Sequence, residues 1–144
     1  MKNSLYLLLM FIAAGCSVKT QKQKALPPDT EITIQNAKQV TAFDNTPESV
    51  VMYFYASMIR KDKEWEKVCP KEGKQTKMFR GKMEDYSSWT FAKYRFVKKE
   101  EFEKDKYWVT IYMSIIYEGK PDDGEDQVTV EKINGKWLIT EVPT

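Results

Sequence analysis

The amino-acid sequence predicts an α+β fold in which N-terminal helices pack on an antiparallel sheet of three or four strands. Apolar residues recur at helical spacing between residues 47 and 69, whereas they alternate with polar residues after residue 89. In addition, Asn134-Gly135 lies between two alternating segments, which is typical of a tight β-hairpin. Helices followed by a run of strands indicate an antiparallel sheet and not alternating βαβ units.

The first helix is predicted to begin at Pro47. Asn45-Thr46 supplies capping side chains, Pro47 suits the first helical position, and Glu48 places an acid in the first turn. The helix is expected to end near Lys61. Its main apolar stripe lies at positions i, i+3, i+4 and i+7, which are Val51, Phe54, Tyr55 and Met58.

The segments around this helix are less strongly patterned. A second short helix is expected over residues 64–69, where Pro70 stops it. Residues 71–86 are mostly charged and allow either a third short helix or a mobile lid. Upstream, Ile32 and Ile34 alternate with polar residues and allow either an edge strand or a loosely packed segment.

The second half of the chain is predicted to form a meander. The expected elements are a strand over 89–102, a strand over 106–118, a turn over 119–124, a strand over 127–133 and a last strand over 136–142. A two-residue loop at Asn134-Gly135 would pair Val130 with Ile139 and Lys132 with Trp137. These pairs place the closing strand in a defined register.

Composition limits the functions that the chain can perform. It has 144 residues, with 23 Lys and Arg, 21 Asp and Glu, and a formal net charge of +2, so no nucleic-acid partner is expected. It has no His, which removes the most common general base and transition-metal ligand. Any catalysis would need carboxylates, Tyr, Lys or Cys69. We expect Cys69 to be a buried structural thiol.

The first 16 residues resemble the signal of a bacterial lipoprotein. Lys2 precedes an apolar run, Leu5 to Ala14, that is too short to span a bilayer but suits an export signal. The following Ala13-Ala14-Gly15-Cys16 resembles the lipobox, although that family prefers Leu where Ala13 stands. The alternative is an ordinary secretory peptide in which Cys16 has no special role.

The lipoprotein resemblance implies a domain organisation and a location. Residues 1–15 would be a removed signal peptide, Cys16 the lipidated N-terminus, and residues 16–30 a flexible tether. A single domain would follow over residues 31–144. Ser17, in place of an Asp after the cysteine, favours the periplasmic face of the outer membrane. The membrane would then be a partner through the N-terminal lipid.

Three passages resemble the nuclear-transport-factor-2-like superfamily, in particular its small bacterial lipoproteins. They are residues 46–55 for the opening helix, residues 62–68 for the short second helix and residues 128–139 for the closing hairpin. The resemblance implies a cystatin-like cone, in which the helices pack on a curved sheet. It also allows a homodimer. The fold supports many activities, so it implies no single chemistry.

Because no catalytic set is recognisable, we expect a non-catalytic accessory module that binds a small molecule or an envelope protein. One alternative is a small-molecule enzyme of the SnoaL or ketosteroid-isomerase type, which would need a desolvated tyrosine or carboxylate inside the cone. The candidate side chains match no family catalytic position: Tyr53, Tyr94, Tyr112, Tyr117, Asp85 and Glu141. We therefore expect no catalytic residue and no cofactor. Another alternative is an inhibitor or immunity-type protein with an exposed apolar patch.

Two further features have a functional and a structural interpretation. Pro121 to Asp126 contains four acids and could hold calcium, but it lacks the ligand spacing of an EF-hand, so an exposed turn without metal is favoured. The four tryptophans, Trp65, Trp89, Trp108 and Trp137, are expected to pack in the core or at its rim. Of these, Trp137 is the one most strongly expected in the core.

Overall fold

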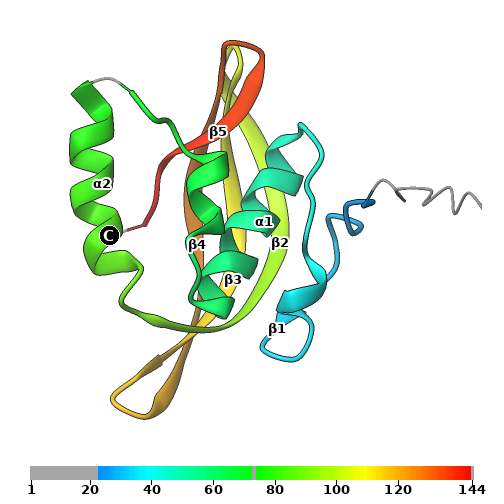
Figure 1. Ribbon diagram of the computed structural model, residues 1–144, viewed down its shortest axis with the longest axis vertical. Helices are drawn as coiled ribbons and strands as arrows, with labels where there is room; N and C mark the ends of the chain where they lie inside the picture. The colour runs from blue at the N-terminus through cyan, green and yellow to red at the C-terminus, as the bar shows by residue number, and fades with distance from the viewer. Residues whose placement is uncertain (1–22, 73, 144) are drawn as a thin grey trace, which may run out of the picture.

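The computed structural model describes residues 23–72 and 74–143, and its main element is one curled antiparallel sheet of five strands. The strands are β1 (Ile32–Thr33), β2 (Thr90–Glu103), β3 (Lys106–Tyr117), β4 (Lys120–Ile133) and β5 (Lys136–Glu141). They lie in the order β1-β2-β3-β4-β5, so each strand pairs with its neighbour in sequence. Figure 1 shows this sheet behind the helices.

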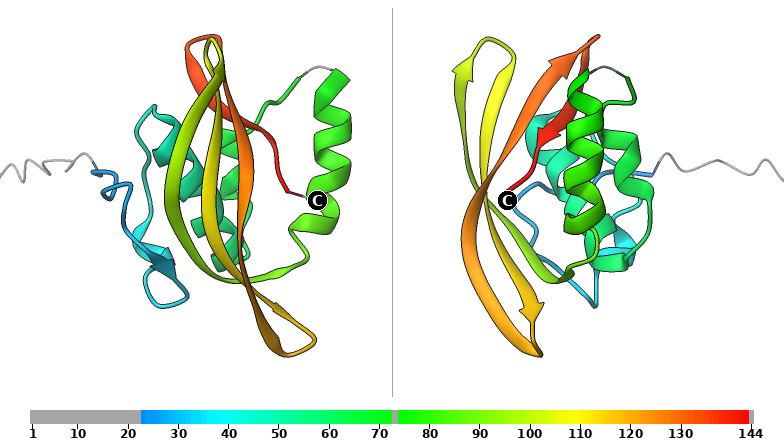
Figure 2. Two further views of the ribbon diagram at one scale, coloured as in Figure 1. Left: turned by 180° about the vertical axis from the view of Figure 1, so that it is seen from behind. Right: turned by 90° about the vertical axis from the view of Figure 1, so that its left-hand side faces the viewer.

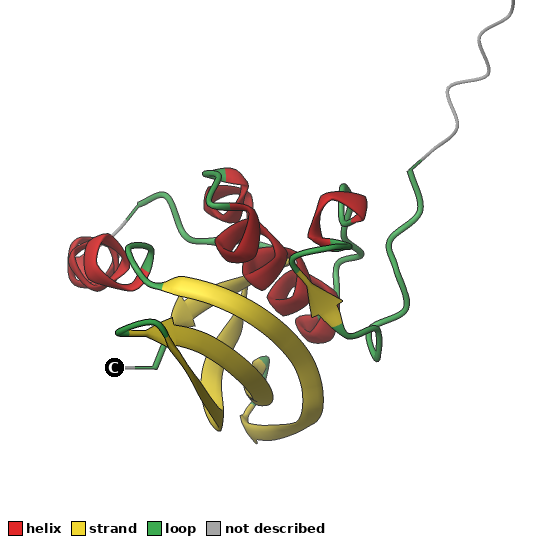
Figure 3. Ribbon diagram, turned by 90° about the horizontal axis from the view of Figure 1, so that it is seen from below, coloured by secondary structure: helices red, strands yellow, loops and turns green. Residues whose placement is uncertain are grey.

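Two α-helices and two 3-10 helices lie between β1 and β2. They are η1 (Ala37–Gln39), α1 (Pro47–Arg60), η2 (Glu64–Val68) and α2 (Lys74–Tyr86). Seen from below, the strands curve around one side of α1, while β1 lies on its other side and α2 stands beyond the end of the sheet (Figure 3). In the described part of the chain, no helix is long and apolar enough to cross a membrane.

Helix α1 is buried on nearly all sides because the sheet covers one face and the remaining helices and β1 cover the others. Eleven consecutive residues, 49–59, are buried. The helix begins as expected, since the Thr46 side chain accepts a hydrogen bond from the Ser49 amide and Pro47 occupies the first position. Lys61 ends it in the left-handed conformation, with φ of 58°.

The hairpin between β4 and β5 also forms as predicted. Asn134 and Gly135 both have positive φ, and Val130 pairs with Ile139 while Lys132 pairs with Trp137. The side chain of Asn45 joins this hairpin to the start of α1. Its Nδ2 donates to the Gly135 carbonyl at 2.8 Å, and its Oδ1 accepts from the Trp137 amide at 2.9 Å.

The predicted fold class is wrong in strand number and in the position of the helices. The sheet has five strands instead of three or four, and it dominates the fold. The helices are not N-terminal to the sheet, because β1 precedes them and pairs through Ile32 with Tyr94 and through Thr33 with Lys93. Of the two alternatives that the sequence left for this segment, the edge strand is therefore confirmed, although it covers only Ile32 and Thr33.

The predicted turn over 119–124 is also wrong. The chain reverses at Glu118 and Gly119, both with positive φ, and Lys120 already begins β4. Residues 120–128 pair with β3 on one side only, because β5 begins its pairing at Thr129. An edge segment tolerates Pro121 and a cluster of acids, since its outer backbone groups face solvent.

Candidate functional site

The structure does not bring the predicted candidate side chains together. Tyr53 lies on α1 and donates to Glu64 Oε2 at 2.8 Å. Tyr112 lies on the sheet face turned away from α1, under the guanidinium of Arg95, and Tyr117 is 64% exposed at the end of β3. The remaining acids are separate too, since Asp85 is exposed on α2 and Glu141 is exposed on β5.

Tyr94, the remaining predicted candidate, belongs to a buried aromatic cluster beneath α1. Its ring stacks on Tyr55, with centroids 5.2 Å apart and planes at 9°. The Tyr55 and Tyr86 hydroxyls share a hydrogen bond of 2.6 Å, and Tyr86 donates to Met113 Sδ at 3.7 Å. Sequence patterns placed Tyr55 on the apolar stripe of the helix and contained no signal for its polar partner, which comes from α2.

Burial makes these three tyrosines poor catalytic bases. It raises the pKa of Tyr55, Tyr86 and Tyr94 well above the ordinary value, and for Tyr55 the neighbouring Tyr86 adds to the effect. Among the described residues, the Tyr94 hydroxyl has no hydrogen-bond partner. The cluster therefore consists of neutral, packed side chains at physiological pH.

The acidic segment of β4 does not form a metal site. Because it is a strand, its successive side chains point to opposite faces of the sheet, so the carboxylates of Asp122, Asp123, Glu125 and Asp126 do not converge. Within residues 23–72 and 74–143, no group of three or more His, Cys, Asp or Glu side chains could hold a metal ion.

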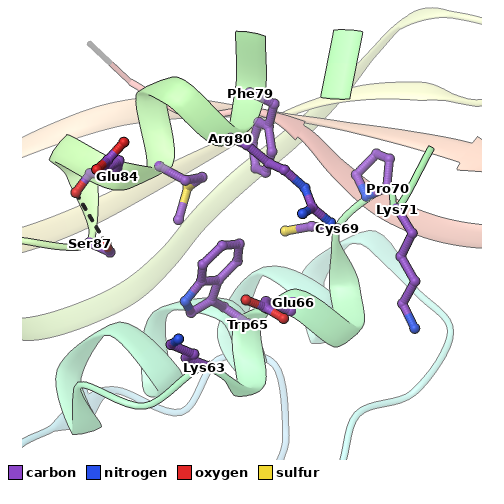
Figure 4. A pocket seen from close by; sticks show the side chains of 11 residues that line it. Lys63, Trp65, Glu66, Cys69, Pro70, Lys71, Phe79, Arg80, Glu84 and Ser87 are labelled. Carbon is purple, nitrogen blue, oxygen red and sulfur yellow. Dashed lines mark hydrogen bonds between the residues drawn. The ribbon is translucent and has the colours of Figure 1, made fainter. Parts of the chain in front are cut away.

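A surface groove between η2 and α2 is the candidate ligand site. Its volume is about 350 Å³. The residues that line it come from η2, α2 and the segment between them: Lys63, Trp65, Glu66, Cys69, Pro70, Lys71, Phe79, Arg80, Met83, Glu84 and Ser87. Figure 4 shows the Trp65 ring and the Arg80 side chain pointing into the same space, beside Cys69.

The floor of the groove is apolar and its rim is charged. Phe79 and Met83 of α2 are buried, as is Cys69, while Trp65 is half-buried. Burial raises the pKa of the Cys69 thiol well above its usual range, and nearby Glu66 adds to this effect. The thiol is therefore protonated and unreactive, and it contributes an apolar surface.

A polar hub at the end of α1 holds η2 and thus one wall of the groove. Asp62 accepts hydrogen bonds from Ser57 Oγ, from Arg60 Nε and from the Glu64 amide. Ser57 Oγ in turn accepts from the Trp65 amide at 2.9 Å. Although burial alone would raise it, these hydrogen bonds lower the pKa of the Asp62 carboxyl below its usual value.

The remaining tryptophans lie at the rim of the core. Trp89 and Trp137 are half-buried, and Trp137 packs edge-on against Tyr107 with centroids 5.3 Å apart. Trp108 is 40% exposed and stacks on Phe102. The predicted signal over 1–15 and the lipidation site at Cys16 lie outside the described residues.

The comparisons with known proteins relate the chain to one solved fold. No protein-family model and no curated protein matches. The chain is similar to the solution structure of a SEC-C motif containing protein from Rhodopseudomonas palustris, with a TM-score of 0.52 and 18% identity. The match covers 76% of this chain and 86% of that one.

This match corrects the family prediction. The similarity is to a SEC-C motif protein, and the five-stranded half-barrel is not the predicted helix-packed cone. The nuclear-transport-factor-2-like assignment is therefore wrong, and none of the three comparisons adds support for a lipoprotein. At 18% identity, the likeness shows a shared fold and nothing about activity.

Proposed function

We propose that this protein is a non-catalytic binding module anchored by a lipid on Cys16 to the periplasmic face of a bacterial outer membrane, with the groove between η2 and α2 as its ligand site. The observation that carries the proposal is the groove itself, which combines an apolar floor with a charged rim at the surface. Ligand sites commonly have a mostly apolar lining and a few polar groups that orient the ligand.

Absence of catalysis is supported by the distribution of reactive side chains. The tyrosines and carboxylates that an isomerase-type reaction would use lie on different faces of the fold, and the Cys69 thiol is held in its protonated form. A nucleophile or general base needs a partner within hydrogen-bond reach. In the groove, neither Glu66 nor Glu84 makes a side-chain hydrogen bond or ion pair within the described residues.

The charge of the rim favours an amphipathic acid as the ligand. Lys63, Lys71 and Arg80 outnumber Glu66 and Glu84, and the guanidinium of Arg80 can bind a carboxylate through two parallel hydrogen bonds. Trp65 and Met83 would then contact an alkyl chain. A volume of about 350 Å³ is at the small end of ligand pockets and suits a chain of modest length.

The length of sequence between Cys16 and the domain suits an anchored module. Leu26, within the predicted tether, packs against the core. Leu26 is ten positions after Cys16 in the sequence, and a flexible tether of about ten residues would span roughly 17 Å. A tether of that length would keep the domain close to the membrane surface.

Titration with dodecanoate tests the groove, with dodecanol as the matched neutral probe. We expect saturable binding of dodecanoate by calorimetry and weaker binding of dodecanol. Arg80→Gln should weaken dodecanoate binding roughly three- to tenfold. Ser87→Trp should fill the groove and abolish the binding of dodecanoate. Lys77→Gln on α2 lies outside the lining residues and should leave binding unchanged. If the Ser87→Trp variant bound dodecanoate as tightly as the unsubstituted protein, the groove would not be the binding site.

Mass spectrometry of the protein expressed in bacteria tests the anchor. We expect a mature chain that begins at Cys16 and carries a diacylglycerol, and we expect Cys16→Ala to release the protein from the membrane fraction. Unchanged membrane binding of the Cys16→Ala variant would contradict the anchor, whereas the dodecanoate titration would still test the groove.

A further inference from the structure

The convex face of the sheet is a second surface that is available for a partner. Val109 and Ile111 of β3 and Val128 and Val130 of β4 are fully buried on the concave side, against the helices. The residues that alternate with them therefore point outward. In the left view of Figure 2, β2, β3 and β4 lie side by side with no helix in front of them.

Strand pairing arranges the outward residues in rows that cross from β2 through β3 to β4. Three successive rows are Lys93, Ser114 and Asp123; Arg95, Tyr112 and Glu125; and Lys98, Thr110 and Gln127. In the first two rows, β2 presents a cation, β3 an uncharged side chain and β4 an acid. Neighbouring strands are about 4.8 Å apart, so the opposite charges of a row lie roughly 10 Å apart.

Most of these charges have no partner within the described parts of the chain. Arg95 lies over the Tyr112 ring, 5.2 Å from its centroid, and makes no ion pair. Asp123 and Glu125 likewise make none, and only Lys93 reaches an acid, Glu31, at 3.7 Å. The strands thus display a positive column on β2, formed by Lys93, Arg95 and Lys98, and a negative column on β4, formed by Asp123 and Glu125. The uncharged residues of β3 form a middle column between them.

We propose that two copies of the chain dimerise through this convex face about a two-fold axis parallel to β3. Rotation about that axis places β2 of each copy over β4 of the other and keeps every row opposite itself. Arg95 then faces Glu125 of the second copy, and Lys93 faces Asp123 of the second copy, each twice. The pattern is self-complementary, as an isologous interface requires.

The same pattern excludes the other face-to-face arrangement. A two-fold axis perpendicular to the strands would place the positive column over the positive column, which is unfavourable. Along the favoured axis, the middle column meets its own counterpart. It contributes Tyr112, which is half-buried, and Trp108 and Ile116, which are 40% and 37% exposed. Aromatic side chains are common at the centre of interfaces.

Charge reversal followed by sedimentation equilibrium tests the dimer. The sample is the full chain carrying Cys16→Ser, in density-matched detergent, so that no lipid joins the copies. We expect a dimer that Arg95→Glu and Glu125→Arg each weaken roughly tenfold, because each change affects two symmetry-related pairs. The double variant R95E/E125R should restore it. Lys98→Glu is the matched control, since its row faces uncharged Gln127.

Three results would overturn the proposal: a monomer up to about 100 μM, where even weak specific contacts begin to populate a dimer; a dimer that neither single reversal weakens; or a double variant that stays as weak as the single ones.

Cross-linking keeps the test independent of the charge variants. Tyr112→Cys should react with a bis-maleimide that spans about 10 Å, the separation of packed sheets. Tyr117→Cys should not cross-link, because Tyr117 follows the outward Ile116 in β3 and therefore points away from the convex face. Equal cross-linking at both positions would contradict the axis.

Discussion

The two faces of the sheet contain the same strands but have different physical roles. On the concave face, Val109, Ile111 and Val128 are fully buried beneath α1, together with the aromatic rings of Tyr55 and Tyr94. On the convex face, the charged residues at the alternating positions of the neighbouring strands, such as Arg95, Asp123 and Glu125, are exposed, whereas the small Thr110 and Ser114 between them are buried. The comparison shows that the pleat of each strand separates the residues that stabilise the fold from those available for a partner.

The largest difference in stability should come from truncating one phenylalanine on each side of the sheet, one in the helix that covers the concave face and one on the convex face. Phe54 of α1 is fully buried, whereas Phe102 of β2 is 39% exposed and stacks on Trp108. We expect Phe54→Ala to lower the free energy of unfolding by about 3–5 kcal/mol, because it leaves a cavity. Phe102→Ala should lower it by about 1 kcal/mol or less. Urea unfolding monitored by circular dichroism measures both, and equal losses would contradict the comparison.

A second pair of variants separates hydrogen bonding from packing within the buried cluster. Tyr86→Phe removes the partner of the Tyr55 hydroxyl and should cost about 1–3 kcal/mol. Tyr94→Phe removes a hydroxyl that has no partner in the described chain, so it should be neutral or stabilising by up to about 1 kcal/mol. Thermal and urea unfolding provide the measurement. A loss for Tyr94→Phe as large as that for Tyr86→Phe would refute this assignment.

The smallest expected loss of unfolding free energy is at the polar hub around Asp62, which joins α1 to η2. This loss depends on pH. Asp62→Asn should cost about 1–2 kcal/mol at neutral pH, since the carboxylate is partly exposed. Because folding lowers its pKa, Asp62 stabilises the protein above its unfolded pKa, near 3.9, and loses this contribution as pH falls through the folded value. The difference in unfolding free energy between the unsubstituted protein and the Asp62→Asn variant should therefore shrink below about pH 4.

An exposed aspartate supplies the control for the pH effect. Asp85→Asn on α2 should leave the unfolding free energy within about 0.5 kcal/mol at both neutral and acidic pH. If Asp62→Asn were equally silent at neutral pH, the hub would not stabilise η2, and the groove wall would depend on packing alone.

Local signals in the sequence predicted several elements of the fold. The cap and proline at the start of α1 and the Asn134-Gly135 loop each depend on a few neighbouring residues, so their structures follow from local chemistry. By contrast, Pro121 and the acids beside it have the composition of a turn but lie in a strand. Their conformation depends on pairing with β3, which no local pattern contains.

The candidate site was less predictable than the fold. The groove combines η2 with α2, two elements whose relative position follows from how each packs near the sheet. The sequence pattern singled out Tyr53, Tyr94, Tyr112 and Tyr117. The tertiary structure instead paired Tyr55 with Tyr86 from another helix and left those four tyrosines apart from one another. Contacts between distant segments depend on the whole chain, and no spacing rule encodes them.

The sequence by itself determined the position of α1, the register of the closing hairpin and the alternation of inward and outward side chains, because each follows from residues adjacent along the chain. Only the tertiary structure decided that α1 is enclosed on nearly all sides, that five strands form one curled sheet, and that a groove separates η2 from α2. The physical reason is that burial and long-range pairing are properties of elements brought together, and their free energy is absent from any single segment.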